Sequence, residues 1–214
     1  MRAMRIAAAL LVVAACGGGT KPVDPKPAPK PSTPYAAMFE SGRTFTFATE
    51  YSESTGEESE EEQMGAVKGT ATCTVAEVVA IADGQASRIA CEFKGEMIGT
   101  DPLTGTWISA PGGLYKGDEL PAAGATVETK WLQLVLGNPP APFQEDIVEE
   151  DENETEGSGV VALRQEGDAW CWSYSVALGD EIWQSLCFGP EGLRSGDFGW
   201  AGGSVHSTKF TVAK

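Results

Sequence analysis

The chain has 214 residues, with 31 acidic against 15 basic residues, a formal net charge of −16 at pH 7 and a hydrophobic content of 42%. Binding to a phosphate backbone requires clustered lysine and arginine, and the densest basic group here, Lys21, Lys26 and Lys30, lies in a proline-rich stretch. The composition therefore argues against nucleic acid as a partner. The length of the chain is sufficient for one folded domain with a hydrophobic core.

Residues 1–15 have the pattern of an export signal. Arg2 and Arg5 form a positively charged start, and an uninterrupted apolar or small stretch follows from Ile6 to Ala15. About ten apolar residues in a helix rise roughly 15 Å, which is half of a hydrocarbon core of about 30 Å. The segment is therefore too short for a permanent membrane span.

The residues at the end of this segment, Val13-Ala14-Ala15-Cys16, resemble the lipobox of bacterial lipoproteins. The resemblance implies that Cys16 carries a diacylglycerol thioether and an acylated amino group, with chains such as palmitate, and so anchors the mature protein to a membrane. Gly17 after the cysteine implies sorting to the outer membrane of a Gram-negative bacterium. The alternative is an ordinary cleaved signal whose mature chain begins near a cysteine.

Residues 16–34 are predicted to be a lipidated tether. Glycines follow Cys16, and prolines then recur at nearly every second or third position with lysines between them. Polyproline II extends about 3.1 Å per residue, so this stretch could hold the folded body on the order of 40 Å from the lipid surface. We expect a disordered signal and linker, followed by a single β-rich domain over residues 35–214.

Four cysteines remain once Cys16 is assigned to lipid: Cys73, Cys91, Cys171 and Cys187. An even number in an exported chain predicts two disulfides, and sequence order favours Cys73 with Cys91 and Cys171 with Cys187 among the three pairings. Zinc is the competing interpretation. It is disfavoured because there is no CxxC pair and His206 is the only histidine.

Alternation of apolar and polar residues predicts a mainly β protein. In Thr44 to Tyr51, for example, Phe45 and Phe47 share one side of a half-buried strand. Other predicted strands are Val67–Ile81, Ser87–Phe93, Gly105–Ser109, Glu128–Val135, Gly159–Gln165, Trp170–Ala177, Ile182–Phe188 and Val205–Val212, with one short helix near Tyr35–Glu40. We expect an antiparallel curved sheet, a half-barrel or a sandwich, or two similar β modules. The pattern loosely resembles the curved sheets of periplasmic lipoprotein carriers.

The second cysteine pair fits a hairpin register. A three-residue loop, Leu178-Gly179-Asp180, places Cys171 directly opposite Cys187. The same register predicts a core face that includes Trp172, Leu186 and Phe188, and an opposite face that carries the cysteines, small serines and Trp183. For Cys73 and Cys91, a two-residue turn at Asp83-Gly84 does not bring the cysteines opposite each other, so that pair requires a bulge or a different turn.

One pattern, P-x-G-L-x-x-G-D, occurs twice, at Pro111–Asp118 and Pro190–Asp197. We favour the interpretation that two β modules use the same glycine turn to re-enter the sheet. A repeated ligand loop and chance similarity are the alternatives.

Two acidic runs, Glu57–Glu62 and Glu145–Glu156, are predicted to be solvated, mobile loops. Calcium binding is the competing interpretation. A calcium-binding EF-hand loop starting at Asp151 fails, because Gly157 falls at its seventh position instead of the sixth and Ala162 occupies the position of the twelfth-place glutamate.

The sequence contains no catalytic motif: there is no GxSxG, no phosphate-binding glycine loop and no HExxH. His206, between Val205 and Ser207, is interpreted as a surface or edge histidine of the last strand. Of the six tryptophans, Trp172 is predicted to lie in the core and Trp183 on a contact surface. We therefore assign no catalytic residue, no metal ligand and no cofactor.

The leading functional hypothesis is an exported, membrane-anchored lipoprotein of the cell envelope that acts as a non-enzymatic binding or structural module for a protein or small molecule. A second hypothesis is a carrier of an apolar or lipid ligand in a half-barrel, which requires an apolar concave pocket. A third is a hydrolase that uses two carboxylates, since any two of the many acids could lie at a suitable distance.

Overall fold

The computed structural model describes residues 33–55, 63–95, 103–150 and 156–213, and Cys16 with the signal and most of the tether lies outside these ranges. In chain order the elements are η1 (Ala36–Phe39), β1 (Thr44–Thr55), β2 (Gln63–Ile81), β3 (Gly84–Lys94), β4 (Gly105–Ala110), β5 (Gly113–Gly117), η2 (Thr129–Trp131), β6 (Gln133–Gly137), β7 (Phe143–Glu150), β8 (Glu156–Glu166), β9 (Ala169–Leu178), β10 (Asp180–Gly189), β11 (Gly192–Ala201) and β12 (Ser204–Val212). No helix among the described residues is long and apolar enough to cross a membrane.

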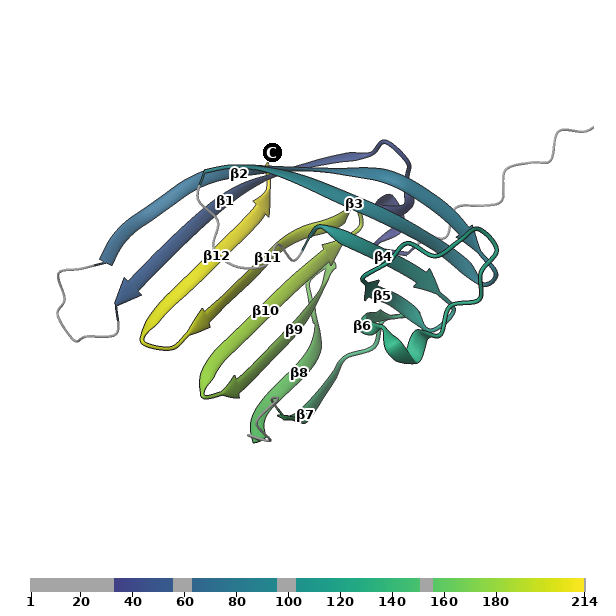
Figure 1. Cartoon of the computed structure of the whole chain (residues 1–214). Coiled ribbons are helices and arrows are strands. Elements are labelled where there is room, and N and C mark those ends of the chain that lie inside the picture. The colour runs from purple at the N-terminus through teal and green to yellow at the C-terminus, as the bar shows by residue number, and fades with distance from the viewer. Residues whose placement is uncertain (1–32, 56–62, 96–102, 151–155, 214) are drawn as a thin grey trace, which may run out of the picture. The chain divides into compact units, whose positions relative to one another are not determined.

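The strands form one antiparallel sheet in the order β6-β5-β4-β3-β2-β1-β12-β11-β10-β9-β8-β7 (Figure 1). The predicted fold class, a mainly antiparallel β protein with a curved sheet, is confirmed. The two halves, β1–β6 and β7–β12, are each a meander of sequential hairpins, and they join where β1 pairs with β12. Both halves therefore belong to one continuous sheet.

The connection between the halves requires the curvature. β6 and β7 lie at opposite edges of the sheet, yet only residues 138–142 link them. Such a link spans at most about 20 Å, which is far less than the width of a flat sheet of this size. The sheet therefore bends until its edges approach each other, without pairing into a closed barrel.

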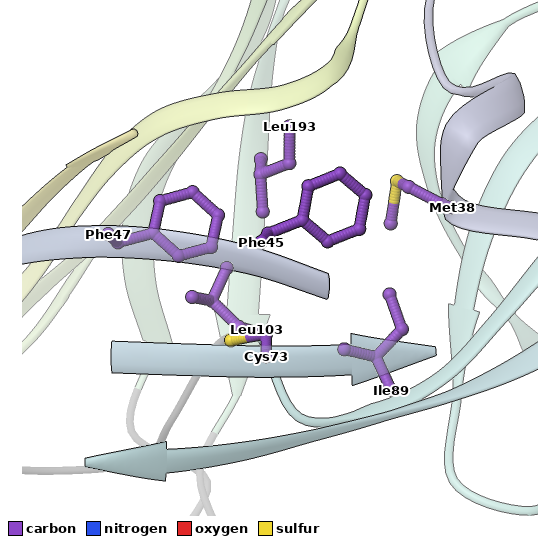
Figure 2. A pocket seen from close by; sticks show the side chains of 7 residues that line it. All are labelled: Met38, Phe45, Phe47, Cys73, Ile89, Leu103 and Leu193. Atoms are coloured by element: carbon purple, nitrogen blue, oxygen red, sulfur yellow. The ribbon is translucent and has the colours of Figure 1, made fainter. Parts of the chain in front are cut away.

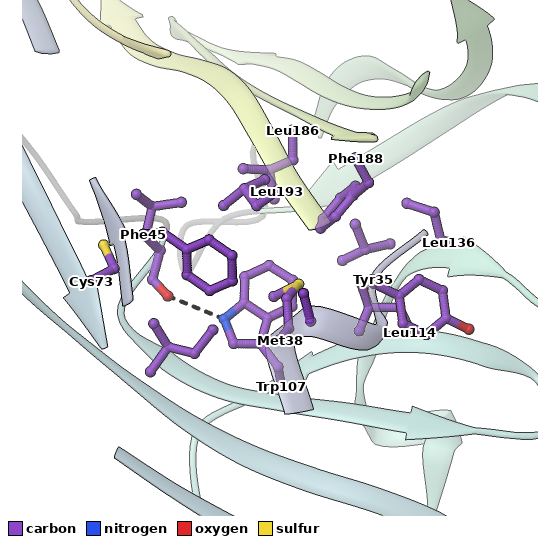
Figure 3. Packing of buried hydrophobic residues seen from close by; sticks show 14 of the residues in the cluster. Tyr35, Met38, Phe45, Cys73, Trp107, Leu114, Leu136, Leu186, Phe188 and Leu193 are labelled. Carbon is purple, nitrogen blue, oxygen red and sulfur yellow. Dashed lines mark hydrogen bonds between the residues drawn. The ribbon is translucent and has the colours of Figure 1, made fainter. Parts of the chain in front are cut away.

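The main core lies on the concave face. Trp107 on β4 and Phe188 on β10 contact each other edge to face, with ring centroids 6.2 Å apart, although many strands separate them in the sheet. Tyr35 and Met38 beside them have no exposed surface and belong to the η1 segment (Figure 3). The apolar η1 segment thus fills the space between the two halves at one end of the concave face, and we call this end the η1 end.

The repeated P-x-G-L-x-x-G-D pattern lies at two corresponding hairpin turns, β4–β5 and β10–β11. Gly113 and Gly192 open the second strand of each hairpin with φ of 148° and 101°, which side chains other than glycine rarely adopt. Leu114 and Leu193 follow, and both are buried in the main core. The structure therefore agrees with the favoured interpretation, a shared turn that re-enters the sheet.

Both predicted disulfides are present, Cys73–Cys91 and Cys171–Cys187. Cys171 lies directly opposite Cys187 in the register set by the Gly179 turn, as predicted. The hairpin that contains Cys73 and Cys91 has both a different turn and a bulge, which were the two alternatives open from the sequence. Its turn starts from Ile81 opposite Gly84, and a bulge between Val75 and Glu77 brings the cysteines into line.

The two disulfides lie on different faces of the sheet. Cys73 is 1% exposed and belongs to the main core cluster, together with its neighbour Phe45 in the adjacent strand. Cys171 and Cys187 share the opposite, convex face, because their strand neighbours Trp172 and Leu186 are the residues that enter the core. One disulfide therefore contributes to core packing, and the other joins two strands on the outer face.

Some predicted elements differ from the structure. The acidic run that begins at Glu145 was expected to be a loop, but residues 145–150 are part of β7. This prediction is wrong because β7 is an edge strand, where Phe143 packs against the core while exposed carboxylates such as that of Glu145 stay in water. Residues 151–155 and the run Glu57–Glu62 lie outside the described ranges.

Pattern alone also missed β5, β7 and β11, and it placed a strand over residues 128–135 where the chain forms η2 and then β6. The segment from β5 to β6 covers the convex face instead of extending the sheet. Its Leu120, Val127 and Leu132 pack against a second, smaller apolar cluster. Gly124 donates its backbone N–H to the carbonyl of Ala80, which fixes the segment against the end of β2.

Candidate functional site: a polar cluster around His206

Five side chains on β1, β11 and β12 form a polar group on the concave face, linked by hydrogen bonds and one ring contact. They are Tyr51, Glu53, Trp200, Ser204 and His206, and we call them the His206 cluster. Glu53 is eight residues beyond Phe45 along β1, or roughly 26 Å of extended strand. The cluster therefore lies at the opposite end of the concave face from η1.

The register of three neighbouring strands brings these residues together. His206 on β12 lies opposite Glu53 on β1 and opposite Trp200 on β11. Ser204 and Tyr51 share this face, because residues two apart on a strand point to the same side. Ile182 on β10, which is 46% exposed, continues the row beyond Trp200.

Donation from Tyr51 to the Glu53 carboxylate sets the direction of the other hydrogen bonds in the cluster. The hydroxyl of Tyr51 donates to Glu53 Oε2 over 2.9 Å, so its oxygen acts as the acceptor toward His206 Nδ1, 3.1 Å away. With its proton on Nδ1, the neutral imidazole carries a lone pair on Nε2. The Ser204 hydroxyl, 2.6 Å from Nε2, then donates to it.

The imidazole ring is held tightly. His206 is 8% exposed, and the indole of Trp200 stacks on it with ring centroids 4.3 Å apart and planes 24° apart. Glu53 Oε1 lies 3.9 Å from Nε2, close enough to stabilise the ring when it is protonated. The interpretation of His206 as a surface or edge histidine is wrong, because β12 lies between β1 and β11 and the side chain faces inward.

The sequence did not identify this group, although two signals were present. Tyr51-Ser-Glu53 and Ser204-Val-His206 each place two polar side chains on one face of a strand. The missing step was the pairing of the first strand with the last, which brings these two short motifs side by side.

The predicted contact residue Trp183 lies on the convex face with the second disulfide, as the register indicated. Its indole N–H donates to Asp197 Oδ1 over 2.6 Å, and its ring lies over Gly199. Trp172, predicted to be a core residue, is 1% exposed. Trp183 therefore belongs to the outer face, and Trp172 to the packed interior.

A small apolar cavity lies in the main core near η1 (Figure 2). Its volume is about 10 Å³, roughly the minimum for a single water and far too small for an acyl chain. It is lined by Met38, Phe45, Phe47, Cys73, Ile89, Leu103 and Leu193.

Two tyrosines on the concave face have shifted pKa values. Burial raises the pKa of Tyr35 beside η1. Burial, followed by a hydrogen bond with Glu149, raises the pKa of Tyr174 on β9. Both phenols therefore stay protonated to higher pH than a phenol in water.

Within the described residues, no group of three or more histidine, cysteine, aspartate or glutamate side chains is arranged to hold a metal ion. The four disulfide cysteines have structural positions in hairpins, and Cys16 lies outside the described residues. Comparison with known proteins found no matching protein-family model, no matching curated protein and no matching solved structure.

Proposed function

We propose that this chain is an exported lipoprotein, anchored through Cys16 in the outer membrane of a Gram-negative bacterium, whose domain over residues 35–214 is a binding or structural module. The observation that carries the proposal is the pair of disulfides, Cys73–Cys91 and Cys171–Cys187. Such bonds form and persist in oxidising compartments outside the cytosol. They agree with the export signal that the sequence predicts for residues 1–15.

The open sheet supports a binding role. One end of its concave face is closed by packed apolar side chains, whereas the other end carries the partly exposed Trp200 and Ser204 of the His206 cluster, with the exposed Ile182 in the same row. The proline-rich tether would hold this surface away from the lipid, where a protein or small molecule can reach it. The cavity near η1 is too small to support transport of an acyl chain, so we do not propose a carrier function.

The anchor is tested by substituting Cys16→Ser in cells grown with a clickable palmitate analogue. We expect the wild-type protein to be labelled and to sediment with membranes, and the variant to lose both properties. The double variant Cys171→Ser/Cys187→Ser is the matched control, because it also removes cysteines but leaves the anchor. Labelling of the Cys16→Ser variant at the wild-type level would contradict the proposal.

A further inference from the structure

The hydrogen-bonded chain through the His206 cluster has the direction that activates a serine. Ser204 donates to His206 Nε2, and His206 Nδ1–H donates to Tyr51, which donates to Glu53. A serine hydroxyl becomes nucleophilic when a correctly oriented base accepts its proton, and a third group fixes the orientation of the base. We propose that Ser204 is a nucleophile, activated by His206, that reacts with neutral carboxylic esters.

This inference goes beyond the proposed binding role, since it adds an acyl-transfer reaction to it. It also revises the expectation that the chain has no catalytic residue. That expectation came from motifs contained in one segment, whereas these residues come from two strands at opposite ends of the domain sequence.

The serine lies where a molecule in solution can reach it. Ser204 is partly exposed and follows the β11–β12 turn, where a side chain added at Gly203 would meet no atom within 4 Å. Trp200 and Ile182 continue the row from His206 and offer apolar surface for an acyl group. The nearby Glu53 carboxylate and the net charge of −16 disfavour an anionic substrate.

The reaction balances with water as the only co-reactant. Ser204 Oγ attacks the ester carbonyl carbon while its proton passes to His206 Nε2, and the bond between that carbon and the alcohol oxygen breaks. The departing alcohol takes the proton from Nε2, which leaves an acyl group on Ser204. Water then attacks the same carbon while His206 accepts its proton, and the bond between that carbon and Ser204 Oγ breaks as His206 returns the proton to Oγ, which releases a carboxylic acid and the free serine.

Tyr51 and Glu53 act through His206 and are positioning residues. Tyr51 fixes the proton on Nδ1, which leaves Nε2 as the acceptor. Glu53 Oε1, 3.9 Å from Nε2, stabilises the imidazolium that forms when the proton is transferred.

The test uses the full-length protein in detergent micelles, with a fluorophosphonate probe for the nucleophile and p-nitrophenyl butyrate as the ester. We expect one phosphonate on Ser204, located by peptide mapping, and hydrolysis of the ester. Ser204→Ala should abolish both reactions. His206→Gln should slow them at least about 100-fold, because a general base contributes roughly that much or more.

The matched control is Ser207→Ala. Ser207 lies on the same strand but bonds to Ser52 on the opposite face, so labelling should be unchanged. Tyr51→Phe should slow labelling and change its pH profile, which a purely structural role would not do. Circular dichroism confirms that each variant is folded. Absence of label on Ser204 in folded wild-type protein, or labelling unaffected by His206→Gln, would overturn the proposal, whereas the Cys16 labelling experiment would be unaffected.

Discussion

The two ends of the concave face are held together by different interactions. At the η1 end, Tyr35, Met38 and Trp107 have no exposed surface and contact one another through apolar packing. At the other end, His206 and Tyr51 are almost as buried, but they are connected by hydrogen bonds. Burying polar groups stabilises a fold less than burying apolar groups of the same size. The η1 end therefore contributes more to the stability of the fold. The polar end is the better candidate for a chemical function.

The largest effect is expected at the η1 end. Trp107→Ala should lower the free energy of unfolding by about 3–5 kcal/mol, because it removes a fully buried indole and leaves a cavity. Urea unfolding of the oxidised protein measures the change. Trp131→Ala is the control, since that side chain is 75% exposed and its removal should change stability by no more than about 0.5 kcal/mol. Equal effects of the two variants would contradict the assignment of the core.

Removal of either disulfide should cause the next largest loss of stability, and the two losses should differ. They close loops of similar length, with sequence separations of 18 and 16 residues, so chain entropy alone predicts about 3 kcal/mol for each. Cys73→Ser/Cys91→Ser should cost more than Cys171→Ser/Cys187→Ser, because Cys73 is packed in the core. Unfolding free energies of the two double variants test the order. The reverse order would show that the convex-face disulfide has the greater structural role.

At the polar end, Tyr51→Phe should destabilise the protein by about 1–3 kcal/mol, since it leaves the buried Nδ1–H of His206 without its acceptor. Ser52→Ala is the neighbouring control, because it breaks a hydrogen bond on the opposite face with Ser207. Its expected effect is about 0.5–1.5 kcal/mol. Thermal unfolding of the two variants measures these changes in stability. If Tyr51→Phe were harmless, the hydrogen-bonded chain would not be formed in solution.

The smallest effect is expected from the two shifted tyrosines. Because burial raises their pKa above the ordinary value of 10.0, the folded state holds these protons more tightly than the unfolded state. Their contribution is complete below pH 10.0 and is lost as pH rises above it. Tyr35→Phe and Tyr174→Phe should each weaken the alkaline loss of stability, measured as midpoint temperature against pH. An unchanged pH dependence of stability in both variants would contradict the raised pKa values of the two tyrosines.

What could be predicted from the sequence depended on whether a feature is local or involves residues far apart in the chain. The register of the Cys171–Cys187 hairpin was predicted correctly, because alternation and the Gly179 turn are local signals. The edge strand β7 was missed because its charges hide its alternation, and its pairing with β8 and the contact of Phe143 with the core are tertiary features. The His206 cluster was missed because pairing between the first and last strands, β1 and β12, is a long-range property of the curved sheet.

The direction of the hydrogen bonds around His206 decides whether Ser204 is activated, and the presence of a single histidine makes it directly measurable. Nitrogen NMR of the full-length protein with ¹⁵N-labelled histidine, at a pH where the ring is neutral, reports which nitrogen carries the proton. The structure predicts a proton on Nδ1, bonded to Tyr51, and none on Nε2, which accepts from Ser204. A proton on Nε2 would contradict the activation of Ser204.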